Sequence, residues 1–555
     1  MLRPKLLTLI KVEPWEFTPR RILADLNAGL IVAFIAIPLS IALGIASGVM
    51  PGKGLVTAVV AGFLISFLGG SRVQIGGPTG AFVVIVYGII QTYGMSGLIT
   101  ATAMAGMLLV LMGVMKFGAV IRYIPYPVVT GFTNGIAVVL FSTQINDFLG
   151  LDLKEIPADF IEKWMLYIKN IPFFNPATLA TGVGALLLII FYPKRLKFLP
   201  APLAALVVTT LVVNIFSLPV ETIATHFGDI SNSMAFSLAM PTFSLELIGK
   251  LFQPALTIAI LAGIESLLSA VVADGMIGKK HRSNMELVAQ GIANIGSSLF
   301  GGIPATGAIA RTAANINHGG RTPVAGMSHA IFILILMVAF MDYVEMIPMV
   351  TLAVILFTIS YRMFDWKAFS EIRKAPFNDT LILLVTFLLT IFVDLVYAIE
   401  IGMILAAFLF MKRMSDITHI DDSDEVYEGI EESDIENKKK LEHVIVYEIN
   451  GPFFFGAADK FVEYIEKIKE CNTIILRMRK VPAMDATGYY ALYKLYRRCQ
   501  ASSTRLILCQ VQKQPLKVLQ NYGFINVLGR RNFAMNIDHA LKKAENDLHE
   551  AASPT

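Results

Sequence analysis

The segments GGPTG, residues 76–80, and GGIPATG, residues 301–307, lie far apart in a very apolar chain and resemble each other. Each follows a run too long and apolar for a soluble helix, and each opens a new apolar run. Glycine and proline at such places favour a helix broken within the bilayer, whose N-terminal N–H groups point at an anion. Paired interruptions of this kind in two halves indicate the binding site of a secondary transporter. We therefore expect an anion transporter with its site at these segments.

The composition supports a membrane protein. Of the 555 residues, 55% are hydrophobic and 16% are charged, which excludes an ordinary soluble globule. The net charge of +4 gives no indication of nucleic-acid binding. The N-terminus lacks a signal-peptide pattern, so the first apolar run, near Ile22, is expected to be retained. The cysteines have no metal-type spacing, and we interpret them as reduced thiols of a cytoplasmic domain: Cys471, Cys499 and Cys509.

Apolar runs recur from residue 22 to residue 411 and predict fourteen membrane segments. Three of them are too short to cross about 30 Å of hydrocarbon as straight helices, and two of the fourteen are expected to be half-helices. The runs are 22–46, 53–69, 78–92, 97–117, 124–147, 176–193, 199–218, 252–273, 284–299, 305–316, 322–341, 344–361, 379–394 and 396–411.

The distribution of basic residues predicts the orientation. With the N-terminus in the cytoplasm, the loops on that side are rich in lysine and arginine, and fourteen segments return the C-terminus to the same side. The opposite loops then hold only Lys53, Lys154, Lys163, Lys169 and Lys250. We expect a bacterial inner-membrane protein with both termini in the cytoplasm.

The spacing of further landmarks predicts a duplication. Ile124-Pro125 follows Pro78 by about as many residues as Ile347-Pro348 follows Pro304. Seven segments precede residue 225 and seven follow residue 250, so the two repeats enter the membrane from opposite sides. This predicts a 7+7 inverted repeat over 22–225 and 250–412, behind a cytoplasmic N-terminal segment, 1–21.

The chain changes character after residue 412. An acidic linker is predicted over 413–440, because it is too charged to form a core. Strand-like runs then alternate with helical patterns, which predicts a small α/β domain over 441–547 and a tail over 548–555.

These motifs resemble the sulfate permease (SulP) family of anion transporters. The strongest match is GGIPATGAIARTAANINHGGRTPVAG, residues 301–326, which is similar to the signature of the tenth segment. AIPLSIA, residues 36–42, is similar to the first segment, although Leu39 and Leu43 stand where many members have Gln and Tyr. The C-terminal domain resembles the STAS domain shared by sulfate transporters and anti-sigma-factor antagonists. In its MDATG loop, residues 484–488, Thr487 occupies the phosphoacceptor position.

The resemblance implies a core domain and a gate domain of seven-plus-seven segments, commonly as a homodimer. It places the substrate between the third and tenth half-helices. The carriers of the family include those of sulfate, bicarbonate, chloride and dicarboxylates. We expect the STAS domain to be a regulatory or assembly domain, with Thr487 as a candidate regulatory site and a cytoplasmic protein as a possible partner.

The candidate substrate-binding residues follow from the chemistry of helix N-termini. Each half-helix start contributes roughly +0.5 charge and free N–H donors, and threonine hydroxyls add further donors. The alternative is that these glycines and prolines only bend and pack helices. The candidates are Thr79, Gly80, Ala81, Thr306, Gly307 and Ala308.

Two charged residues within apolar runs complete the predicted site. Arg311 follows Pro304 by two helical turns and resembles the arginine that supplies positive field in many members; the alternative is a salt bridge or snorkelling. Glu265 lies within an apolar run, with Ser269 one turn later, and is a candidate ion-coupling site. Sodium-coupled bicarbonate carriers resemble this pair but carry Asp and Thr. A buried carboxyl favours a proton, and a purely structural carboxylic acid is the remaining alternative.

The leading hypothesis is a secondary active transporter of sulfate, a dicarboxylate or bicarbonate, working by proton symport. The alternatives are a sodium-coupled bicarbonate transporter, an anion channel on the same scaffold, and a membrane-tethered STAS signalling scaffold. The sequence contains no nucleotide P-loop, metal cluster or nucleophile–base set. We therefore expect no cofactor beyond the coupling ion, no catalytic residue and no enzymatic activity.

Overall fold

The computed structural model divides the chain into two units, Met1–Ile404 and Leu405–Thr555. The residues that it describes are 2–119, 124–153, 156–157, 159–193, 200–228, 238–242, 244–393, 395–421, 444–454, 456–458, 461–462 and 471–552. Several basic residues of the orientation argument, Arg122, Lys154, Lys194, Arg195 and Lys197, lie outside them.

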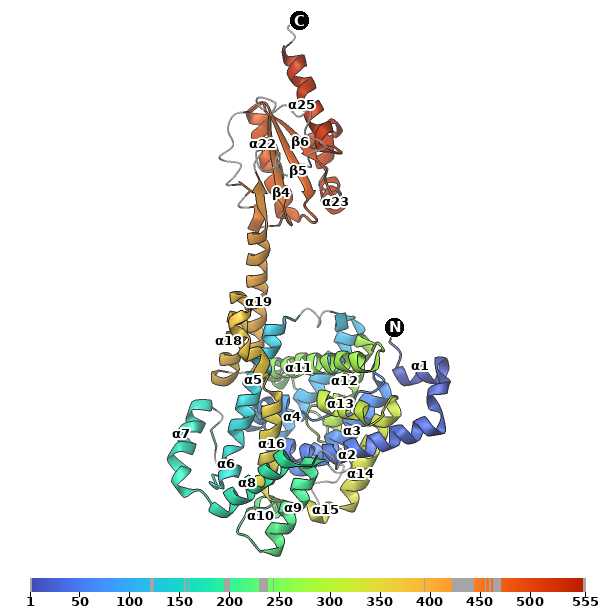
Figure 1. Ribbon diagram of the computed structural model, residues 1–555, viewed down its shortest axis with the longest axis vertical. Helices are drawn as coiled ribbons and strands as arrows, with labels where there is room; N and C mark the ends of the chain where they lie inside the picture. The colour runs from blue at the N-terminus through green and yellow to red at the C-terminus, as the bar shows by residue number, and fades with distance from the viewer. Residues whose placement is uncertain are drawn as a thin grey trace. The chain divides into compact units, whose positions relative to one another are not determined.

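The first half of the membrane unit follows the predicted runs closely (Figure 1). The fourth helix contains two predicted segments, 78–92 and 97–117, which are joined at Gly94, where φ is 66°. The elements are α1 (Lys5–Val12), η1 (Pro14–Phe17), α2 (Pro19–Ala46), α3 (Pro51–Leu68), β1 (Gly76–Gly77), η2 (Gly80–Phe82), α4 (Val83–Val114), α5 (Tyr126–Thr143), α6 (Ile145–Leu149), α7 (Phe160–Asn170), η4 (Ile171–Phe173), α8 (Pro176–Phe191), α9 (Ala201–Ile215) and α10 (Ile223–Phe227).

The second half has the corresponding order, with a second broken segment at β2 and α13. Each of the fourteen predicted runs contains a helix, which confirms the predicted helical membrane fold. The elements are α11 (Leu245–Ile277), α12 (Ser283–Leu299), β2 (Thr306–Gly307), α13 (Ile309–Asn317), α14 (Pro323–Ala339), α15 (Met341–Val344), α16 (Met349–Met363), α17 (Trp366–Ser370), η6 (Ile372–Lys374), α18 (Phe377–Phe392) and α19 (Leu395–Ile417).

Helix lengths agree with a membrane location. In the described part of the chain, five segments are long and apolar enough to cross a bilayer, and the α7–α8 pair, bent by 111°, adds a possible sixth. Four shorter apolar helices, α9, α14, α16 and α18, accompany them. The five are Pro19–Ala46, Pro51–Leu68, Gly80–Val114, Tyr126–Leu149 and Leu245–Ile277.

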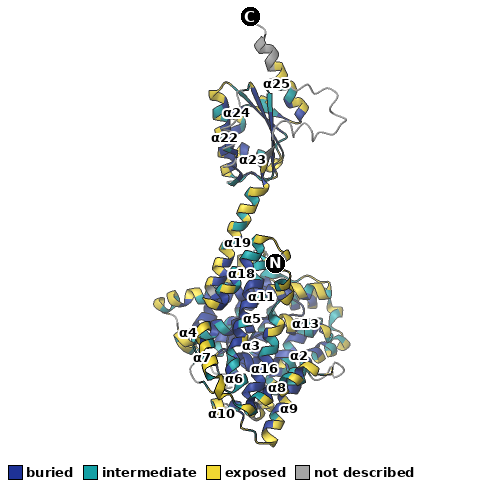
Figure 2. Cartoon of the chain, turned by 60° about the vertical axis from the view of Figure 1, so that its left-hand side comes forward, coloured by how far each residue is buried: buried dark blue, intermediate teal, exposed yellow. Residues whose placement is uncertain are grey.

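The helices pack in two groups. In one group α4 lies along α11 and α12, and α14 packs on α2 and α3; in the other α5 packs on α16 and α18, and α8 on α9 and α16. Small residues allow the closest approach: a Cβ at Gly106 of α4 would lie 2.6 Å from the carbonyl oxygen of Gly291 in α12. Such small-residue contacts are typical of helix packing in membranes. The interior helices are mainly buried, and exposed residues lie at the periphery (Figure 2).

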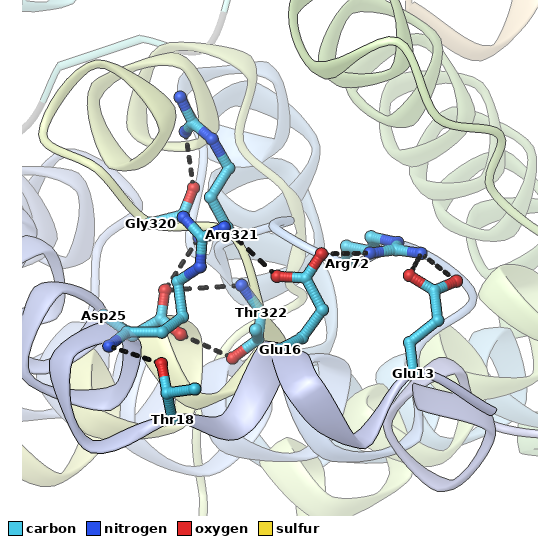
Figure 3. Close-up of polar contacts among 9 residues, drawn as sticks. Glu13, Glu16, Thr18, Asp25, Arg72, Gly320, Arg321 and Thr322 are labelled. Carbon is cyan, nitrogen blue, oxygen red and sulfur yellow. Dashed lines mark hydrogen bonds and ion pairs between the residues drawn. The ribbon is translucent and has the colours of Figure 1, made fainter. Parts of the chain in front are cut away.

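The N-terminal segment is folded against the loop that leads to β1. Arg72, in that loop, donates from Nη2 to both carboxylate oxygens of Glu13 at 2.6 Å, and its Nη1 lies 3.6 Å from Glu16 (Figure 3). Because Arg72 hydrogen-bonds it, the pKa of Glu13 is lowered. Asp25, buried in α2, accepts the backbone N–H of Arg321 at 2.7 Å and the hydroxyl of Thr322 at 2.6 Å. The loops beside both broken segments are thus tied to the first 25 residues.

The second unit contains a five-stranded sheet of order β3-β4-β5-β6-β7, in which only the β3–β4 pair is antiparallel. Helices α22, α23 and α24 pack in one apolar cluster and α25 in another. This confirms the predicted α/β domain. The elements are β3 (His419–Asp421), β4 (Val444–Asn450), β5 (Thr473–Lys480), α22 (Ala486–Ala501), β6 (Arg505–Cys509), α23 (Lys513–Asn521), α24 (Phe524–Leu528), η8 (Arg530–Asn532), β7 (Phe533–Ala534) and α25 (Ile537–Ala552).

Two predicted boundaries differ from the structure. Helix α19 continues to Ile417, and β3 then pairs with β4, so the predicted linker, 413–440, begins with ordered structure. Most of that linker lies outside the described residues. Helix α25 continues to Ala552, into the predicted tail. The linker prediction was wrong at its start because a charged sequence still forms a strand where a neighbouring strand pairs with it.

Candidate anion-binding site

The two broken segments meet as a short antiparallel ladder. Gly76 pairs with Gly307 and Gly77 with Thr306, and the Ala308 N–H donates to the Ile75 carbonyl oxygen at 2.8 Å. Glycine is needed for this approach: a Cβ at Gly307 would lie 1.5 Å from Nε2 of Gln74, and one at Gly76 would lie 2.2 Å from Ile65. The ladder places the starts of the two half-helices at one centre.

The first half-helix begins with unused hydrogen-bond donors. Thr79 is the N-cap of η2 without a side-chain cap bond, and the N–H groups of Gly80 and Ala81 have no acceptor among the described residues. Instead, the Thr79 hydroxyl donates to Oε2 of Glu265 at 3.0 Å. Two predicted residues of different roles, one for the substrate and one for the coupling ion, are therefore in direct contact.

The second half-helix begins later than the sequence motif suggested. The Thr306 hydroxyl contacts Oγ of Ser266 at 2.6 Å, and the Gly307 N–H donates to the same oxygen at 3.1 Å. The expectation of free donors at Gly307 and Ala308 is therefore wrong, because both N–H groups are bonded within the protein. The physical reason is the ladder with β1, which extends the chain through these residues.

The free donors of the second half-helix are the N–H groups of its first turn. Helix α13 starts at Ile309 with Ala308 as an uncapped N-cap, so Ile309, Ala310 and Arg311 present N–H groups without an acceptor in the described structure. Ile309 is 43% exposed, so this helix start is open on one side.

Arg311 lies at the junction of the two segments. Its side chain is buried, and Nη2 donates to the carbonyl oxygen of Pro78 at 3.0 Å. Nε and Nη1 have no hydrogen-bond partner in the described part of the chain. A Cβ at Gly77 would lie 2.4 Å from Nη1, so the guanidinium group rests against the first segment. Arg311 thus adds a full positive charge between the two helix starts.

Ser269 and Glu265, one turn apart on α11, contact different partners. The Ser269 hydroxyl donates to Oγ1 of Thr312 in α13 at 3.3 Å, and the same oxygen accepts the backbone N–H of Ile75 at 3.1 Å. Asp274, near the end of α11, accepts the N–H of His281 at 2.9 Å. The two predicted ion-coupling residues therefore lie on α11 with separate contacts.

Sequence reasoning missed several polar residues around this centre. Ser266 holds the second segment, Gln74 donates to the Ser266 carbonyl oxygen at 3.2 Å, and His329 of α14 is buried with neither ring nitrogen hydrogen-bonded in the described structure. The positions of Ser266 and His329 in apolar runs were a usable signal, because polar side chains within membrane segments are commonly functional or paired. Gln74 lies between two runs and gave no such signal.

Thr487, the candidate regulatory residue, is exposed in the first turn of α22. Asp485 is the N-cap of this helix and accepts the Gly488 N–H at 2.8 Å. The loop is therefore a capped helix start that presents Thr487 to solvent. Its phosphorylation stays a prediction.

The sequence matches two family models: Sulfate permease family over residues 22–386 and STAS domain over residues 437–540. It is 39% identical to YvdB of Bacillus subtilis (strain 168), provisionally named a sulfate transporter, over 92% of this chain and 95% of that protein. It is 28% identical to the bicarbonate transporter BicA of Picosynechococcus, over 95% of each. Murine Slc26a9, an anion transporter, has the same fold, with a TM-score of 0.85, 17% identity and coverage of 98% of this chain and 94% of that structure.

Proposed function

Because the chain belongs to the sulfate permease family of anion transporters, we propose that it is a secondary active transporter that carries a small dianion together with a proton. Sulfate and dicarboxylates are the substrates in view. The observation that carries the proposal is the buried Arg311 guanidinium group, which has unused N–H groups and lies where the two half-helices begin.

The charges of the centre favour a dianion when a proton is present. Two helix starts contribute roughly +0.5 each and Arg311 contributes +1, a total of roughly +2. An ionised Glu265 reduces this total to roughly +1, and a protonated one leaves it at roughly +2. A dianion is therefore held best when Glu265 carries a proton.

The hydrogen bond between Thr79 and Glu265 supplies a route for this coupling. The Thr79 hydroxyl donates to Oε2 of Glu265 at 3.0 Å, and an ionised carboxylate requires such a donor. A protonated carboxyl group is itself a donor and no longer requires this bond. The Thr79 hydroxyl then turns to the anion beside the N–H groups of Gly80 and Ala81, so a proton on Glu265 adds a donor for the substrate.

The runner-up is a sodium-coupled bicarbonate transporter, which the similarity to BicA favours. It requires Glu265 and Ser269 to hold one sodium ion. The proton is favoured instead because Glu265 and Ser269 replace the Asp and Thr that sodium-coupled carriers have at this pair. A channel differs from both by carrying a large uncoupled current.

The test is uptake of labelled sulfate or dicarboxylate into liposomes containing the purified protein. We expect saturable uptake that an inward proton gradient accelerates. Glu265→Gln, which mimics the protonated state, should abolish the acceleration while exchange of anions continues. The matched control is Glu246→Gln, since Glu246 is an exposed acid of the same helix. Uptake that needs sodium and ignores external pH would overturn the proton assignment, and a large chloride current would favour the channel.

A further inference from the structure

A cavity of about 470 Å³ lies beside the outer half of the first half-helix. Its walls come from α4 on one side and from α5, α7 and α18 on the other, which belong to the second packing group. Val83 and Val84 line its inner end, directly after the η2 turn that holds Gly80 and Ala81. The cavity therefore reaches from α7 to the start of the first half-helix.

A buried lysine lines this mostly apolar cavity. Lys163 of α7 is only 4% exposed, and its ammonium group has no acceptor or ion-pair partner among the described residues. Burying such a charge without a partner is costly, so residues of this kind face water or a ligand. The same helix carries Lys169, which is exposed.

The position of α7 fixes Lys163 at the cavity. Trp164 donates from Nε1 to the Ser142 hydroxyl of α5 at 3.0 Å, and the ring of Phe160 lies 5.5 Å from that of Phe392 in α18. These contacts hold α7 against the second packing group, while the cavity separates Lys163 from Tyr87 and Gly88 of α4.

One acidic residue, Asp159, is the other charged side chain in the described lining. It is exposed, and its Oδ1 accepts the N–H groups of Ile161 and Glu162 at the start of α7. Its charge attracts that of Lys163, one turn later on the same helix, but water and these N–H groups offset much of it. The buried ammonium group therefore dominates the field inside the cavity, where screening is weaker.

We propose that this cavity is an aqueous approach site for a small hydrated anion, and that Lys163 holds the anion there before it reaches the half-helix starts. The inference rests on the proposed function for the anion's destination. It adds a second anion site, on the side of the membrane that the orientation argument assigns to the exterior. The anion then passes through the cavity from one site of positive charge to the other.

The test uses a cysteine placed in the cavity. Gly88 lines it, and a Cβ there would meet no atom within 4 Å, so Gly88→Cys fits without displacing a neighbour. The membrane unit has no cysteine of its own. The second unit has three, and their labelling is measured in the unsubstituted protein and subtracted. The probes are an anionic sulfonatoethyl and a cationic trimethylammonioethyl methanethiosulfonate.

We expect the anionic reagent to react faster than the cationic one, and Lys163→Gln to reduce the ratio of the two rates by about tenfold. Lys169→Gln, on the same helix, should leave the ratio unchanged. An unchanged ratio in Lys163→Gln would overturn the proposal. So would a cysteine that reacts with neither reagent, because the cavity would then be closed or filled by lipid.

A second measurement separates this proposal from the proposed function. In the uptake assay, Lys163→Gln should raise the half-saturating concentration of anion applied from outside about threefold or more, with the maximal rate within twofold. The effect should shrink at high ionic strength. Labelling requires no transport, so a protein that fails to transport still reports on the cavity.

Discussion

At the first half-helix Thr79 offers its hydroxyl to Glu265 and leaves the next N–H groups free, whereas at the second Thr306 and Gly307 are both bonded to Ser266. The two segments resemble each other in sequence and lie side by side in one ladder. Their polar groups nevertheless serve different purposes. Those of the second segment hold the chain in the ladder, and those of the first segment remain available to bind another partner. A duplicated motif therefore supplies one fixed and one adaptable half of a site.

The largest expected effect tests the fixed half. Gly307→Ala places a Cβ 1.5 Å from Nε2 of Gln74, so the ladder must shift, at a cost of about 1–3 kcal/mol or more. Gly80→Ala meets the ends of flexible side chains, the nearest being Leu140 at 3.1 Å, and should be milder. Thermal unfolding of the detergent-solubilised protein measures both, with Gly88→Ala as control. Equal destabilisation at Gly80 and Gly307 would remove the proposed difference.

The next largest effect should come from removing the positive charge of Arg311, between the two half-helix starts. Arg311→Gln should weaken anion binding by about tenfold or more while the protein stays folded, because an uncharged side chain is less costly to keep in the membrane. Binding of sulfate to the purified protein, followed by thermal shift, measures this. Arg311→Lys keeps the charge and should bind better than Arg311→Gln. If affinity is unchanged and only expression falls, Arg311 is a structural residue.

A smaller effect should separate the two threonine environments. Ser266→Ala leaves the buried Gly307 N–H unsatisfied and should lower the free energy of unfolding by about 1–3 kcal/mol. The protein that stays folded should still show uptake accelerated by a proton gradient. Thr79→Ala should change stability little and make uptake less responsive to a proton gradient. Unfolding curves and uptake, measured on both variants, give the pattern. A stable Ser266→Ala protein with uncoupled uptake would reverse the assignment of roles.

The smallest effect should come from removing the second unit. Both half-helices lie within Met1–Ile404, and the second unit has its own sheet and apolar clusters. A chain that ends after Ile417, where α19 ends, should bind sulfate with an affinity within about twofold of the full chain. Calorimetric titration compares them. Loss of binding in a monodisperse truncated protein would show that the second unit shapes the site.

The sequence predicted the segments, the pair of broken helices and a charged residue, Arg311, within the second of them, because hydropathy and charges in apolar runs are local signals. It did not predict which groups of the second segment are free. Pro304 suggested that α13 begins near Thr306, but pairing with β1 keeps the chain extended to Ala308. That register depends on a strand more than 200 residues away in the sequence, which no local pattern records. Helix α7 was missed for a different reason: it is short and amphipathic, and hydropathy places it in a loop.

Asp25 has a consequence for how the protein is made. The side chain lies in the first membrane helix, and its partner Thr322 is 297 residues later in the chain. At roughly 5–20 residues per second, the ribosome takes about 15–60 s to synthesise that partner. Through this interval Asp25 lacks its hydrogen bonds from Arg321 and Thr322, and the charge of Arg21, one turn earlier on the same helix, offsets only part of the cost of placing it in lipid. We therefore expect the first helix to be held more firmly in the membrane once the second repeat has been made.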